Sequence, residues 1–273
     1  MSDAYVAAPA GARPESADGP GPFVTHVSYR LADGRLLEWA SRQHRKSAGG
    51  LLGRAIAVLF IVGSACFALG SLPGYSSLVG ERADAVTYFI GSLFFTSAAY
   101  LQFVECISAA PVAGSATRRQ RLVAVEAQRI DWWATAIQLL GTIFFNVTTF
   151  TALDAALSPK GADLVVWTPD ALGSICFLVA SELAFAEAGH AWLSWRPHSM
   201  GWRIAAINLL GSVFFGISAI AGWVQPATGD TLNAALDTSG TFWGAVCFLA
   251  GAVLLLIPGP PAAATRTPGQ AAA

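Results

Sequence analysis

The sequence predicts an all-α membrane protein of six transmembrane helices, and three observations lead to this fold class. Apolar residues make up 54% of the 273 residues and charged residues only 12%, whereas a soluble domain has about a quarter charged residues. The charges gather in a few short stretches and leave six long apolar segments between them. A five-residue pattern recurs once in each of these segments, which indicates that one unit was duplicated.

Each apolar segment is long enough to cross a lipid bilayer. A hydrocarbon core about 30 Å thick requires a helix of roughly 20 apolar residues. Six segments meet this requirement and are predicted as helices: 52–72, 85–105, 132–153, 168–188, 203–224 and 239–257. The chain is therefore predicted to be an integral membrane protein whose main partner is the bilayer, and an oligomer is compatible with this arrangement.

The recurring pattern reads Gly, a small residue, an apolar residue, Cys or Phe, and then Phe. Because residues four apart share one face of a helix, the Gly and the last Phe face the same neighbour. We expect each Gly to admit a Phe of the adjacent helix, since close approach over small residues holds membrane helices together. In each hairpin the fourth position is Cys in one helix and Phe in the other, which balances their volumes. The copies begin at Gly63, Gly91, Gly141, Gly173, Gly211 and Gly244.

The duplicated unit is a two-helix hairpin. Segments 91–105 and 173–187 align without gaps and share Gly, Ser, Phe and Glu at matching positions. The hairpins are therefore predicted at 52–105, 131–187 and 202–257, within a transmembrane domain of residues 51–257. Since every hairpin enters from the same side, the three would be parallel repeats about an axis along the membrane normal.

The distribution of positive charge predicts the orientation. If the six helices alternate in direction, all of the 16 Lys and Arg except Arg82 and Lys160 fall on one side of the membrane. Short loops rich in Lys and Arg stay in the cytoplasm, so both termini are predicted there. Residues 1–22 have no apolar core of a signal peptide, and the predicted location is the inner (plasma) membrane of a bacterial-type cell.

The segments outside the helices differ in character. Residues 1–22 and 258–273 are rich in Ala, Gly and Pro and are predicted as disordered tails. Residues 23–50 form a basic cytoplasmic segment. Its first part alternates apolar and polar residues, and Asp33-Gly34 is a turn signal, so a β-hairpin is expected there.

The basic segment ends in a cluster that contains Arg42, Arg45 and Lys46. Such a cluster next to a membrane helix commonly sets topology and contacts anionic lipid head groups. The alternative interpretation is a small regulatory hairpin that binds a cytoplasmic protein.

No pattern in the chain predicts an enzyme, a cofactor, a metal ion or a nucleic-acid partner. His-Glu-x-x-His, Gly-x-Ser-x-Gly, a phosphate-binding glycine loop and Cys-x-x-Cys are all missing from the sequence. The four His lie outside the cores of the predicted helices, where axial haem ligands would have to be. Three of the four Cys occupy packing positions of the repeated pattern.

The main candidate for function is Glu182, the one charge that breaks the symmetry of the repeats. It lies roughly two turns inside the end of segment 168–188 and about 180° from Gly173, away from the packing face. An ionisable group at such a depth costs about 2.5–3.5 kcal/mol and usually faces a cavity or a partner. The alignment places Tyr100 at the equivalent position of the first hairpin.

Glu182, Gln138, Asn208 and Tyr100 are therefore predicted to line a binding site for a proton, a cation or another small solute, because all four lie at similar depth. Two other interpretations remain open. Glu182 would be protonated within the bundle or reach the interface, and Gln138 and Asn208 would form hydrogen bonds between helices.

The hairpin resembles the YrhK-like membrane domain of bacteria. The resemblance rests on the runs INLLGSVFF at 207–215 and WGAVCFL at 243–249. This family consists of two-helix hairpins without an established activity, so the resemblance implies a fold and no catalytic residue. The three copies and the basic N-terminal segment depart from a single-hairpin member.

Two functions follow as hypotheses. The first is an integral membrane protein that moves or senses a small solute or ion near Glu182. The second is a structural or regulatory membrane protein whose basic N-terminal segment binds a partner or anionic lipid.

Overall fold

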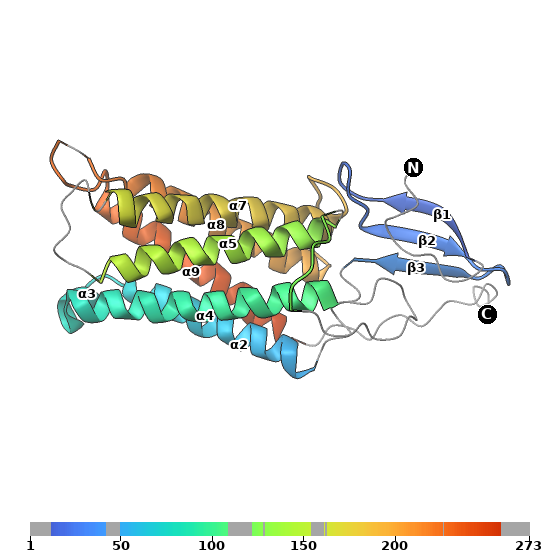
Figure 1. Ribbon diagram of the computed structural model, residues 1–273, viewed down its shortest axis with the longest axis horizontal. Helices are drawn as coiled ribbons and strands as arrows, with labels where there is room; N and C mark the ends of the chain where they lie inside the picture. Colours follow the sequence, from blue (N-terminus) through green and yellow to red (C-terminus); the bar gives the residue numbers. More distant parts are fainter. Residues whose placement is uncertain are drawn as a thin grey trace.

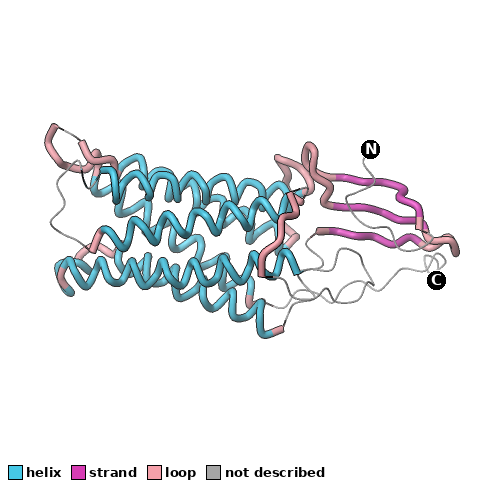
Figure 2. Tube along the Cα trace, viewed as in Figure 1, coloured by secondary structure: helices cyan, strands magenta, loops and turns pink. Residues whose placement is uncertain are grey.

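The computed structural model describes residues 12–41, 50–108, 122–127, 129–153, 161, 163–225 and 227–257. These residues form a mainly helical protein with a small sheet at one end of the helical bundle (Figures 1 and 2). We call this the sheet end and the other the far end. The long helices are α2 (Leu51–Gly70), α4 (Glu81–Ser108), α5 (Ile130–Thr151), α7 (Thr168–Gly189), α8 (Met200–Ala221) and α9 (Ala234–Leu255).

All six long helices have the length and composition of membrane spans, so the prediction of a multi-pass membrane protein is confirmed at this level. A short helix α3 (Tyr75–Val79) follows α2, and one π-helical turn, η1 (Asp163–Trp167), leads into α7. Helix α4 starts at Glu81, ahead of the predicted residue 85. Glu81 and Asp84 occupy its first turn, where acidic side chains interact favourably with the helix dipole although they reduce the apolar character of the segment.

The six helices form a closed ring. Helix α2 packs against α4 and α9, and α4–α5, α5–α7, α7–α8 and α8–α9 complete the circuit. The third position of the repeated pattern points away from the ring, as the exposure of Leu93 and Ile175 shows. The last Phe of the pattern is buried in all six helices, so the ring has an apolar outer surface and a phenylalanine-filled axis.

The glycines of the pattern contact phenylalanines across each hairpin. A Cβ atom added at Gly63 would lie 2.9 Å from Cδ2 of Phe95 and 3.0 Å from the carbonyl oxygen of Gly91. The same Gly–Phe contacts occur between α5 and α7 and between α8 and α9: Gly141–Phe177, Gly173–Phe145, Gly211–Phe248 and Gly244–Phe215. The expected admission of a Phe by each Gly is therefore confirmed.

The three cysteines of the pattern have a steric role. The Cβ atom of Cys66 would lie 2.8 Å from a Cβ atom at Gly91, and Cys176 and Cys247 approach Gly141 and Gly211 in the same way. These cysteines lie where two helices are closest, which favours a small side chain. All four cysteines of the chain lie in the described part, and none of them forms a disulfide.

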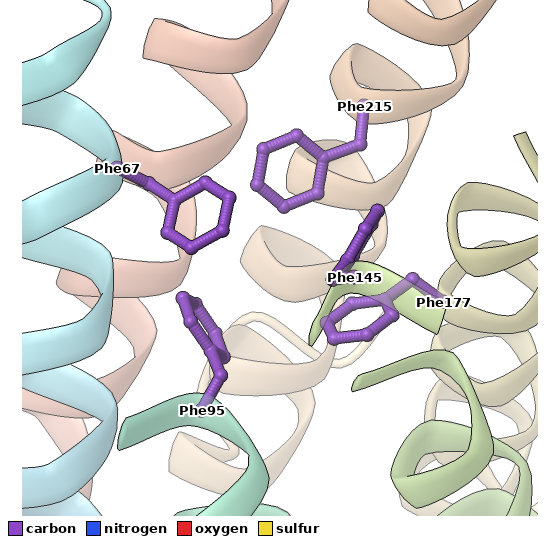
Figure 3. A pocket seen from close by; sticks show the side chains of 5 residues that line it. All are labelled: Phe67, Phe95, Phe145, Phe177 and Phe215. Atoms are coloured by element: carbon purple, nitrogen blue, oxygen red, sulfur yellow. The ribbon is translucent and has the colours of Figure 1, made fainter. Parts of the chain in front are cut away.

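Six phenylalanines close the axis of the ring. Five of them are drawn in Figure 3, with their rings turned toward one another between the helices. Centroid distances run from 5.1 Å for Phe145–Phe177 to 6.4 Å for Phe67–Phe215, and Phe248 stacks on Phe215 at 5.4 Å. The space that these rings enclose has no room for a water molecule.

A buried ion pair lies at the start of α5, at the sheet end. Asp131 is 1% exposed and pairs with the Arg129 guanidinium, which also contacts Glu126 Oε2 at 2.5 Å. Burial alone would lower the pKa of Arg129, but the neighbouring Asp131 carboxylate outweighs it and raises that pKa above its ordinary value. The Cys106 thiol donates a hydrogen bond to Asp131 Oδ2 at 3.4 Å.

The N-terminal sheet consists of β1 (Arg13–Asp18), β2 (His26–Arg30) and β3 (Leu36–Ala40), antiparallel in this order. β2 and β3 form a hairpin in the segment for which the sequence predicts one. Gly34 lies in its turn with a φ of 82°, a conformation that glycine adopts without strain. The side chains of Val27 and Tyr29 are buried.

Strand β1 corrects two predictions: the fold is mainly helical rather than all-α, and residues 13–18 are not a disordered tail. Every residue of β1 is exposed, so no apolar alternation marks the strand, and only pairing with β2 holds it. A bulge between Pro14 and Ser16 interrupts that pairing, as expected for proline, which lacks an N–H to donate. The predictions for 1–11, 258–273 and the cluster Arg42, Arg45 and Lys46 concern segments outside the described residues.

Candidate functional site

Glu182 lies in the wall of a hollow on the outer surface of α7. The hollow has a volume of about 380 Å³ and is lined by Leu178, Val179, Glu182 and Leu183 of α7 and by Trp192 of the following loop. Leu178 and Val179 are 38% and 43% exposed, which places them on the outer side of the ring. In a membrane this side faces lipid.

The helical period explains why Glu182 faces outward. Gly173 and Phe177 face the neighbouring α5 and the bundle axis, and Glu182 is nine residues beyond Gly173, about half a revolution away. Glu182 also precedes the last residue of α7, Gly189, by seven residues, or roughly 10 Å along the axis. The carboxyl group is therefore inside the span, near its sheet end.

Among the residues that the structure describes, none forms a hydrogen bond or ion pair with Glu182. An ionisable group on the lipid side of a helix is costly, and such groups usually have a partner. No described residue therefore compensates the negative charge that Glu182 carries when it is ionised.

The other three predicted site residues do not line this hollow. Asn208 of α8 faces α9, where its Oδ1 occupies the space left by Gly251, and this atom is buried without a donor in the described part of the chain. Tyr100 is 38% exposed on α4, a helix that is not a neighbour of α7 in the ring. Gln138 is half-buried on α5. The shared site of all four residues stays a prediction.

The N-terminal sheet lies beyond the end of α7 (Figure 1), and the chain around Thr25 and His26 contacts His190 at that end. His190 ends the helix in the left-handed conformation, with a φ of 58°. Its Nδ1 lies 2.8 Å from the Thr25 hydroxyl, which is fully buried, and its ring meets that of His26 edge-on at 6.0 Å. The fold therefore ties the β1–β2 connection to the membrane domain through a specific polar contact.

Trp192 lies beside both the hollow around Glu182 and the connection between β1 and β2. It lines the hollow around Glu182, and its Nε1 lies 3.6 Å from the position of a Cβ atom at Gly21, in the connection between β1 and β2. A Trp close to the end of a membrane span is typical of the aromatic belt at the interface, and the sequence indicates no further role for Trp192. Its position beside both the hollow and Gly21 depends on the turn that His190 makes, and the sequence contains no signal for a histidine in that conformation.

A second polar group lies at the far end. Asp84, Asp170 and Asp237 occupy the first turns of α4, α7 and α9, within electrostatic range of Tyr88. The Tyr88 hydroxyl lies 2.8 Å from that of Ser71, and the Ser218 hydroxyl donates to Asp237 Oδ1 at 2.6 Å. First-turn aspartates are the ordinary complement of a helix dipole. The described residues contain no group of His, Cys, Asp and Glu with the arrangement of a metal site.

No family model matches the chain, and neither a curated protein nor a solved structure is significantly similar to it. The resemblance to the YrhK-like membrane domain accordingly stays a prediction.

Proposed function

We propose that this multi-pass membrane protein senses a small positively charged solute at Glu182 and transmits occupancy of that site to the N-terminal sheet. One observation carries the proposal: Trp192 lines the hollow of Glu182 and also lies beside Gly21, in the connection between β1 and β2. A solute that displaces Trp192 would change this contact, and a ligand shifts a protein between two arrangements only if it binds them differently.

The bundle axis favours sensing over movement of the solute through the protein. Because the phenylalanines at the axis enclose no space large enough for a water molecule, a polar solute has no path along the axis in this conformation. A site on the outer surface near the end of α7 needs no such path, since a solute can approach it from the membrane interface.

The proposal also states that both termini are cytoplasmic, that the three hairpins are parallel repeats, and that the protein is not an enzyme. The charge distribution supports cytoplasmic termini in the plasma membrane, and the same Gly–Phe contact in each hairpin supports three parallel repeats. Reporter fusions after residue 120 should be cytoplasmic and those after residue 160 external; the opposite pattern contradicts the orientation.

Amide hydrogen exchange tests the sensing. In nanodiscs, exchange of residues 12–41 should change when ammonium, methylammonium or hexylammonium is added, and Glu182→Gln should abolish the response. The matched control is Glu81→Gln, which removes an exposed carboxylate at the far end and should respond as the parent does. A response that survives in Glu182→Gln, or no response to any of the three, would refute the proposal.

The contact of Thr25 with His190 provides a separate test of the transmission. Thr25→Val removes the hydroxyl but keeps the shape of the side chain, and it eliminates the hydrogen bond of 2.8 Å between that hydroxyl and Nδ1 of His190. We expect about 1 kcal/mol less stabilisation of the docked sheet, seen as faster exchange of residues 12–41 without any solute. Ser16→Ala on the exposed strand β1 is the control and should leave exchange unchanged; equal rates in Thr25→Val and the parent would show that the contact does not hold the sheet.

The alternative is a regulatory protein whose N-terminal segment binds a cytoplasmic protein or anionic lipid. The exposed edge strand β1 favours this second function, because an open edge offers backbone groups for pairing with another chain. The two functions can be compared in cells through a growth phenotype that depends on the protein. Under the alternative, deletion of residues 13–46 abolishes this phenotype and Glu182→Gln has no effect on it. Under the sensing proposal both changes abolish it.

A further inference from the structure

We propose that the ligand class of the hollow is a small amphipathic amine, with its ammonium group at the Glu182 carboxylate and its alkyl chain against Leu178, Val179 and Leu183. This inference rests on the proposed function for the place of the site and narrows the solute to a chemical class. Its basis is the combination of one carboxyl group with an apolar wall on the lipid side of α7.

The composition of the hollow disfavours an inorganic cation. Calcium and similar hard cations take six or more oxygen ligands, whereas among the described residues that line the hollow only Glu182 and Trp192 have ionisable or hydrogen-bonding side chains. An alkylammonium ion needs fewer partners, because one carboxylate accepts its N–H donors and neutralises its charge. Apolar side chains on the rest of the wall would solvate a hydrocarbon chain and would not solvate a metal ion.

The size of the hollow favours a single short chain. A volume of about 380 Å³ is at the small end of the range of about 300–1,000 Å³ for ligand sites. One ammonium group with a short alkyl chain fits a hollow of this volume.

Trp192 provides a second group in the hollow that attracts an ammonium ion. The indole ring of tryptophan is the strongest aromatic partner of ammonium groups, and it attracts them most where water is excluded. Trp192 lines the hollow together with Glu182 and is 45% exposed. An ammonium ion at Glu182 would therefore have a carboxylate and an aromatic ring in the same wall.

Direct binding to the purified protein in phosphatidylcholine nanodiscs tests the inference. By equilibrium dialysis we expect saturable binding of hexylammonium that is at least about tenfold tighter than that of hexanol or of ammonium. Hexanol has the chain without the charge, and ammonium has the charge without the chain. Glu182→Gln should remove the saturable binding, Trp192→Phe should weaken it several-fold, and Glu81→Gln should leave it unchanged.

The other possible outcomes distinguish failure of this inference from failure of the sensing proposal. If ammonium binds as tightly as hexylammonium and both need Glu182, the solute is a small ion: the amine inference fails and the sensing proposal survives. If hexylammonium binds at Glu182 but exchange of residues 12–41 does not respond, the ligand class is right and the sensing proposal fails. If phosphatidylethanolamine in the nanodisc competes fully with hexylammonium, a lipid head group occupies the hollow. If Glu182→Gln instead changes the oligomeric state, the occupant is a second copy of the chain.

Discussion

Replacing Asp131 by Asn is expected to lower the free energy of unfolding by about 3 kcal/mol. Asp131 is 1% exposed and its carboxylate pairs with the guanidinium of Arg129. Removing one charge of a buried pair leaves the other without compensation, which costs about 3–5 kcal/mol. We expect the lower end of this range because Glu126 still contacts Arg129 at 2.5 Å. Thermal or denaturant unfolding of the purified protein in detergent measures the change.

Asp33→Asn is the matched control for this prediction. Asp33 pairs with Arg35 at 2.6 Å, but both side chains are about half exposed. The backbone N–H of Arg35, and then its side chain, lower the pKa of Asp33, so the ion pair is present at neutral pH. Exposed pairs nevertheless contribute little to stability, and the unfolding midpoint should not change. Equal midpoint shifts in the two variants would show that the burial of the Asp131–Arg129 pair has no energetic consequence.

Gly63→Ala is expected to destabilise the bundle by about 1–3 kcal/mol, the usual cost of overpacking a well-packed core. The added methyl group would meet Cδ2 of Phe95 at 2.9 Å and two backbone atoms of α4, the Gly91 oxygen at 3.0 Å and the Phe95 nitrogen at 3.2 Å. The phenylalanine ring is held by other rings of the axis and the backbone atoms belong to a helix, so α2 and α4 would have to separate. The same unfolding measurement detects the loss.

Gly216 provides the control for this steric argument. It lies inside α8, and a Cβ atom there would meet nothing within 4 Å. Alanine forms helices better than glycine by about 1 kcal/mol, so Gly216→Ala should be neutral or stabilising. If Gly63→Ala were as well tolerated as Gly216→Ala, the close approach of α2 and α4 would not limit stability.

The six spans and their packing face could be predicted because both depend on local sequence. Hydropathy identifies a span wherever about 20 apolar residues are consecutive, and the four-residue spacing of Gly63 and Phe67 fixes one face of a helix. The same geometry placed Glu182 on the opposite face from Gly173, and the structure places it on the outer surface. Strand β1 was missed because its residues bury no side chain, so its sequence carries no alternating pattern.

The local sequence could not predict which residues surround Glu182. Equal depth suggested that Gln138, Asn208 and Tyr100 share a site with Glu182, but depth says nothing about direction around a ring. In the structure Asn208 faces α9, Tyr100 lies on a helix that does not neighbour α7, and Trp192 joins Glu182 because the chain turns at His190.

The sequence by itself determined that the chain has six membrane-length helices, that their glycines and phenylalanines share one face, and that Glu182 stands apart from that face. These are properties of single helices, set by hydrophobicity and by a period of 3.6 residues per turn. Only the tertiary structure decided that the ring closes on α2 and α9, that phenylalanines fill its axis, and that Trp192 lines the hollow of Glu182 beside the β1–β2 connection. Contacts between segments far apart in the chain depend on which surfaces fit together, and no local pattern records that fit.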